Sequence, residues 1–124
     1  MNKKIMTSIK LQKLLHFKMQ QRIIDEGYGM RGKSKWIIEA IERFLHLPDY
    51  PSLVDIANEM EQLTEIVSIR LSEDLMNQLE HAIVSVRRQY PAMEGVKSNL
   101  IRASIMQRLI RASSTSVAEY SITY

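Results

Sequence analysis

Hydrophobic and polar residues alternate along a short stretch near the middle of the chain. The apolar positions are Val67, Ile69 and Leu71, and the polar residues Ser68 and Arg70 lie between them. A period of two residues is typical of a β-strand with one buried and one exposed face. The pattern therefore predicts a strand over residues 66–72. So short a strand is not stable alone, because its edges and its apolar face need partners.

The hydrophobic period changes directly after this strand. Ser72 is a favourable N-cap residue, and the acidic Glu73 and Asp74 follow it. Apolar residues then recur at helical spacing: Leu75, Leu79, Ala82, Ile83 and Val86. We expect a helix that ends near Arg88, before Tyr90-Pro91.

The same succession occurs about sixty residues earlier in the chain. Residues 8–12 (SIKLQ) repeat the pattern of residues 68–72 (SIRLS), and a helical pattern follows both. Further along, residues 33–41 (KSKWIIEAI) parallel residues 97–105 (KSNLIRASI). Each unit reads strand, helix, loop, helix, and we interpret the chain as a tandem duplication.

These patterns predict a mainly α fold with a short β-ribbon. Residues 6–12 and 66–72 are expected to pair antiparallel within one chain, with Ile9 and Leu11 facing inward. Helices are predicted over residues 13–26, 34–46, 53–63, 73–88 and 98–112. Ser34, Ser52 and Ser98 are the predicted N-caps of the second, third and last of these helices.

Charge divides the 124 residues into four segments. Residues 1–47, the first unit, carry ten Lys or Arg against four Asp or Glu. Residues 48–64 form an acidic linker with four acids and no Lys or Arg, which could include a short helix. Residues 65–112 form the second unit, and residues 113–124 a flexible tail. A basic unit beside a separate acidic linker suggests a polyanionic partner approached from one side.

One stretch, residues 27–34 (GYGMRGKS), matches the phosphate-binding P-loop pattern letter for letter. A P-loop follows an apolar strand of a parallel sheet, whereas residues 14–26 predict an amphipathic helix. The equivalent loop of the second unit, residues 92–98, keeps the Lys-Ser pair but not the P-loop pattern. We therefore interpret the stretch as a loop and a helix start, and expect no enzymatic activity. A helix N-terminus with an adjacent lysine can still bind an anion such as a phosphate.

Other candidate chemistry is sparse. The chain has no cysteine, no apolar run of membrane-span length and no apolar leader, which predicts a cytoplasmic protein without disulfides. His16, His46 and His81 lack the spacing of metal ligands, and no metal or cofactor is expected. Trp36 is predicted to lie in or at the edge of the core.

Each unit resembles a ribbon-helix-helix DNA-binding unit of the MetJ/Arc-like kind. The resemblance rests on residues 67–75 (VSIRLSEDL) and 32–41 (GKSKWIIEAI), and it covers residues 6–46 and 66–111. It implies an intramolecular pseudo-dimer whose antiparallel ribbon enters the major groove of double-stranded DNA.

The resemblance also assigns roles to individual residues. It implies base reading by the outward ribbon residues Met6, Ser8, Lys10, Ile66, Ser68 and Arg70. It implies phosphate contacts at the starts of the second helices, from Lys33, Ser34, Lys35, Lys97, Ser98 and Asn99. Met6 and Ile66 depart from the polar residues usual in that family, although an apolar side chain can contact a thymine methyl group.

Two unlike strands in one chain favour a directional DNA site over a palindrome. Tandem chains of this length resemble the TraY-type accessory proteins of conjugative relaxosomes, which bind near the nick at an origin of transfer. The partners implied are double-stranded DNA and a relaxase or other relaxosome proteins, with further assembly of the monomer on DNA left open. The alternatives are a ribbon-helix-helix transcriptional or plasmid-copy repressor, a P-loop NTPase and a helical protein-interaction domain.

Overall fold

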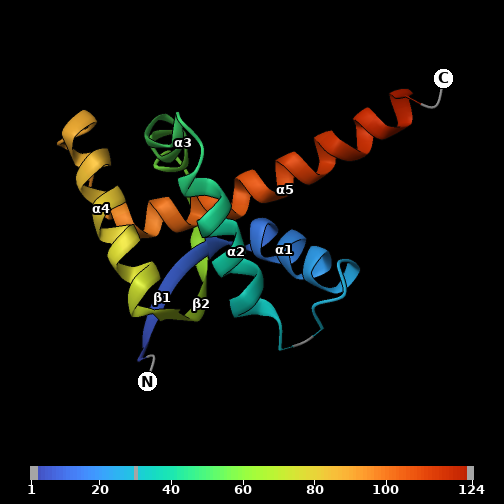
Figure 1. Cartoon of the computed structure of the whole chain (residues 1–124), viewed down its shortest axis with the longest axis horizontal. Helices are drawn as coiled ribbons and strands as arrows, with labels where there is room; N and C mark the ends of the chain where they lie inside the picture. Colours follow the sequence, from blue (N-terminus) through green and yellow to red (C-terminus); the bar gives the residue numbers. More distant parts are fainter. Residues whose placement is uncertain (1–2, 30, 123–124) are drawn as a thin grey trace.

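The computed structural model describes residues 3–29 and 31–122, with side chains as far as residue 111. In chain order the elements are β1 (Lys4–Gln12), α1 (Lys13–Asp25), α2 (Lys33–Leu45), α3 (Tyr50–Ala57), β2 (Leu63–Ser72), α4 (Glu73–Gln89) and α5 (Val96–Ile122). The chain is therefore mainly helical with one two-stranded sheet (Figure 1).

The two strands form an antiparallel ribbon within the single chain, as the alternation of both segments predicted. Ser8 lies opposite Ser68 at the centre, Met6 opposite Arg70, and Lys10 opposite Ile66. Both strands extend further than expected, β1 from Lys4 and β2 from Leu63, and the register is irregular between Leu11 and Gln12.

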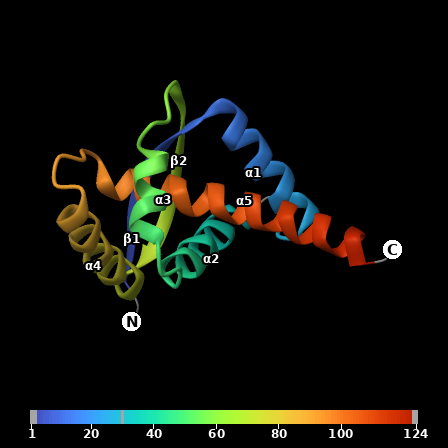
Figure 2. The same ribbon diagram turned by 90° about the horizontal axis from the view of Figure 1, so that it is seen from above.

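One face of the ribbon lies in the core. Its inward residues are at most 5% exposed: Thr7, Ile9, Leu11, Val67, Ile69 and Leu71. Helix α5 runs through the middle of the molecule and contacts α1, α2, α3, α4 and β1 (Figure 2). Each of the other long helices buries one apolar stripe against this centre, at the spacing that the sequence predicted.

Of the four serines predicted as helix N-caps, Ser72 is confirmed and the other three are not. The Ser72 hydroxyl accepts a hydrogen bond of 3.1 Å from the N–H of Leu75, so it is an N-cap. Ser34, Ser52 and Ser98 were wrong as N-caps, because each already lies inside the first turn of its helix. Glycine precedes α2 and α5, and the Gly32 and Gly95 carbonyls accept the first helical bonds, from Trp36 and Asn99.

Two helices have other bounds than predicted. α3 begins at Tyr50, with Pro51 in its first turn, and ends at Ala57 rather than Leu63, because Leu63 already belongs to β2. α5 continues to Ile122, past the expected end near residue 112, and no Gly or Pro interrupts the segment that was predicted to be a flexible tail. No helix in the described part of the chain is long and apolar enough to cross a membrane.

Candidate functional site

The outer face of the ribbon is uncovered. Met6 is 56% and Ile66 68% exposed, and Ser8, Lys10, Ser68 and Arg70 are exposed as well. All six residues predicted to face outward do so. The hydroxyls of Ser8 and Ser68 meet at 3.1 Å across the strands and mark the centre of the face.

Cations lie on both sides of this serine pair. Lys10 belongs to β1 and pairs with Ile66, whereas Arg70 belongs to β2 and pairs with Met6. The two cations are therefore related diagonally across the centre. The outward residues from Lys4 to Lys10 and from Ile66 to Ser72 include no carboxylate. A two-stranded surface of this charge is attractive to a polyanion.

The N-terminus of α2 presents backbone donors beside two lysines. No described side chain caps the helix, so its first N–H groups have no intrahelical or capping acceptor. Lys33 and Ser34 are half-buried and Lys35 is exposed. The three residues that were predicted to hold a phosphate thus adjoin a positive helix end.

His16 on α1 contacts the start of β2. The His16 Nδ1 lies 3.7 Å from the Glu65 carboxylate, next to Ile66. Burial lowers the pKa of His16, the positive charge of Lys33 lowers it further, and Glu65 opposes both. The charge of Lys33 therefore acts on a ring that lies beside the start of β2.

At the start of α5, two of the three predicted phosphate contacts are accessible and one is buried. Lys97 and Ser98 are half-exposed, as a phosphate contact requires, but Asn99 is only 3% exposed. Its amide nitrogen donates to the Asn58 side-chain oxygen at 2.8 Å and to the Glu94 carbonyl at 3.1 Å. The Asn99 side chain is therefore occupied inside the protein, and we remove it from the predicted phosphate contacts.

The stretch that matches the P-loop lies between two helices. α1 precedes it and α2 follows it, and the sheet has two antiparallel strands rather than parallel ones. Gly27 and Gly29 have φ values of +82° and +73°, and a Cβ on Gly32 would lie 2.5 Å from Tyr28 atoms. These glycines are thus explained by the turn itself, and the strand that a P-loop needs is replaced by a helix.

Sequence reasoning missed a buried arginine beneath the ribbon. Arg102 is 6% exposed, its Nη1 donates to the Lys10 carbonyl at 2.9 Å, and its Nη2 donates to the Asn99 side chain. Burial lowers its pKa, and it forms no ion pair with any described carboxylate. The available signal was the arginine itself, because the repeat places it where the first unit has Ile38.

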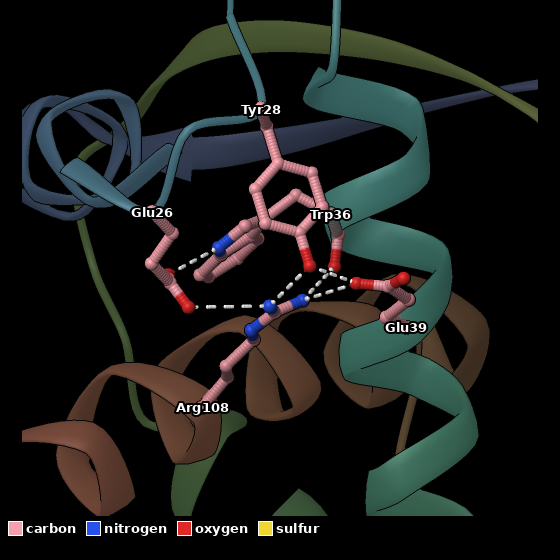
Figure 3. Close-up of polar contacts among 5 residues, drawn as sticks. All are labelled: Glu26, Tyr28, Trp36, Glu39 and Arg108. Atoms are coloured by element: carbon pink, nitrogen blue, oxygen red, sulfur yellow. Dashed lines mark hydrogen bonds and ion pairs between the residues drawn. The ribbon is translucent and has the colours of Figure 1, made fainter. Parts of the chain in front are cut away.

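A second buried arginine, Arg108 on α5, was also missed (Figure 3). It donates to the Trp36 carbonyl at 2.7 Å and to the Tyr28 hydroxyl at 2.9 Å, and it lies over the Trp36 ring. Glu26 and Glu39 lie at 3.3 and 3.4 Å from its guanidinium group. The cluster ties the loop after α1 and helix α2 to α5, so its role is structural.

Trp36 completes this cluster. Its indole N–H donates to Glu26 at 2.8 Å, and its ring is fully buried, in agreement with the prediction of a core position.

The described residues contain no group of three His, Cys, Asp or Glu side chains that could hold a metal ion. Comparisons of the chain with protein-family models, curated proteins and solved structures found no match.

Proposed function

We propose that this chain binds double-stranded DNA through the β1–β2 ribbon, inserted into the major groove. The observation that carries the proposal is the exposed outer face of the ribbon, which holds hydroxyls, Lys10 and Arg70 and no carboxylate. The major groove of B-DNA admits a two-stranded ribbon, and its base edges present donors and acceptors to such side chains.

Base reading and phosphate binding fall to different residues in this proposal. Arg70 can donate two hydrogen bonds to one guanine, whereas Lys10 offers a point charge. Met6 and Ile66 would contact thymine methyl groups. The uncapped start of α2, with Lys33 to Lys35, and the start of α5, with Lys97 and Ser98, would bind flanking phosphates.

The pairing register supports the interpretation of the chain as a pseudo-dimer of two repeats. In the two strands, residues 60 apart are equivalent in the predicted repeat, and Ser8 pairs with its own equivalent, Ser68. An approximate two-fold axis through this pair would relate Lys10 to Arg70 and Met6 to Ile66. Because the related side chains differ, the two halves of the DNA site would differ too.

A directional site suits an origin of transfer, where one strand is nicked at one place. We therefore propose that the protein acts as an accessory protein of a conjugative relaxosome, by analogy with TraY-type proteins. The second candidate is a transcriptional or plasmid-copy repressor, which the same ribbon would serve. The uncovered ribbon favours both over the interaction-domain and NTPase alternatives.

Footprinting on the DNA that flanks the encoding gene tests the proposal and separates the two candidates. We expect one protected, non-palindromic site, whose affinity falls steeply as salt concentration rises. Protection beside a nick site supports the relaxosome role, and protection over a promoter supports the repressor. The Arg70→Ala and Lys10→Ala variants should need higher protein concentrations for the same protection, whereas the Arg87→Ala variant, changed at an exposed residue of α4, should protect like the wild type. Binding that none of these variants changes would contradict the proposal.

A further inference from the structure

Helix α1 carries an exposed apolar face that the proposed DNA contact does not use. Leu14 is 61%, Phe17 55% and Ile24 65% exposed, and their spacing sets them along one side of the helix. The equivalent residues of α4 are Asp74, Asn77 and Val84. Such a stripe is therefore a feature of one unit and not of the repeat.

Two open hollows border this face, with volumes of about 490 and 800 Å³. Phe17 lines both of them. Their charged lining residues are Lys33 in the first and Lys13 in the second, and neither hollow has a carboxylate among its lining residues. Lys13 and Lys18 are exposed, each one turn from a residue of the apolar stripe, and they outnumber the one exposed acid of this helix, Asp25. A surface that complements this face would be apolar at its centre and acidic around it.

The chain carries such a surface on α3. Ile56 is 56% exposed and is the large apolar residue on the outer side of this short helix. Asp55 precedes it, the exposed Glu59 follows in the turn after the helix, and the chain has no Lys or Arg between Arg43 and Arg70. The acidic linker thus contains the short helix that the sequence predicted, and this helix carries an exposed apolar residue.

We propose that the apolar, basic face of α1 (Leu14, Phe17 and Ile24 with Lys13 and Lys18) binds the acidic surface of α3 and the turn after it (Ile56 with Asp55 and Glu59) of a second copy. In the single chain α1 and α3 are both packed against α5 (Figure 1), and the apolar residues of the two faces stay exposed. Burial of the apolar residues drives the contact, and the opposite charges orient it.

A contact between two α1 faces would be less favourable. It would bring the same cations, Lys13 and Lys18, of both copies together, and like charges in one interface disfavour the complex. The α1–α3 contact avoids this repulsion, because each copy contributes a basic and an acidic surface. It uses none of the outward ribbon residues of the proposed DNA contact.

Sedimentation of the protein without DNA tests the contact separately from DNA binding. We expect the wild type to associate as its concentration rises and to dissociate as salt is added. The Phe17→Asp and Ile56→Lys variants should each be monomeric, since each has lost one half of the contact. An equimolar mixture of the two should associate again, because the intact α1 of one can bind the intact α3 of the other.

The Val84→Asp variant is the matched control, because Val84 occupies the equivalent place on α4 and is 50% exposed. It should associate like the wild type. Charge reversal gives a second route: Lys18→Glu should weaken association, and mixing this variant with Glu59→Lys should restore it. A monomeric wild type at every concentration, or a Phe17→Asp and Ile56→Lys mixture that stays monomeric, overturns the proposal. If Phe17→Asp loses association and Ile56→Lys keeps it, the α1 face binds a surface other than α3, and the proposal is wrong.

Discussion

The guanidinium group of Arg102 on α5 donates a hydrogen bond of 2.9 Å to the main-chain carbonyl of Lys10 on β1. A side chain of α5 therefore holds the backbone of β1 directly beneath an outward residue of the ribbon. The predicted repeat aligns Arg102 with Ile38, which carries no donor.

Arg102→Ala should lower the free energy of unfolding by about 2–4 kcal/mol, because it opens a cavity and leaves buried acceptors unpaired. Arg102→Met should cost less, since it fills the space and removes a buried cation that has no described carboxylate partner. Denaturant titrations of both variants measure the difference. The exposed Arg88→Ala variant is the control, and an equal loss in Met and Ala variants would contradict this account.

Substitutions in the ribbon should separate base reading from general affinity. Arg70→Ala should cost about 1–3 kcal/mol on the cognate DNA site and relax one base position. Lys10→Ala should relax a position on the other side of the centre, because Lys10 and Arg70 lie diagonally across the serine pair. Selections on randomised DNA with both variants measure these positions. If both variants weaken all sequences alike, the ribbon does not read bases.

Lys33→Ala should weaken DNA binding similarly on all sequences. It removes one cation beside the uncapped start of α2, so the slope of log affinity against log salt should fall by about one unit. Titrations at several salt concentrations check this, with Arg87→Ala as the control. The same variant addresses the P-loop match: magnesium-dependent ATP binding that Lys33→Ala abolished would reverse our interpretation of the loop.

Glu39 should contribute stability that disappears in acid. The hydrogen bond from Tyr28 is the main cause that lowers the pKa of Glu39, and Arg108 adds to it. A carboxyl whose pKa is lower in the folded state stabilises the protein above its unfolded pKa, about 4.3 for Glu. This stability is lost as the pH falls through the folded value. Glu39→Gln should therefore lower the free energy of unfolding at pH 7. Below a pH of about 4, the free energy of unfolding of this variant should fall less than that of the wild type.

Unfolding titrations between pH 7 and 3 of the wild type, Glu39→Gln and Glu42→Gln test this pH dependence. Glu42 lies on the same helix and is exposed, so its variant should follow the wild type. Parallel curves for the wild type and Glu39→Gln would show that the pairing with Tyr28 and Arg108 does not stabilise the fold.

The apolar pattern by itself determined the ribbon, the faces of the long helices and the Ser72 N-cap. Alternation over Val67, Ile69 and Leu71 identifies a strand, and the matching pattern around Ile9 identifies its partner. The outward position of Met6, Lys10 and Arg70 follows from the same alternation. These features are local or repeat at a fixed distance, so a single sequence is enough to predict them.

The tertiary structure decided which polar residues lie inside. Arg102, Arg108 and Asn99 look like surface residues in the sequence, but all three are buried. Arg102 bonds to Lys10, 92 residues away. Arg108 bonds to Trp36, 72 residues away, and Asn99 to Asn58, 41 residues away. The tertiary structure also set the starts of α2 and α5, which follow Gly32 and Gly95. A buried polar group is stable only where distant segments bring matching donors and acceptors together. The hydrophobic period along the chain does not predict hydrogen bonds between distant segments.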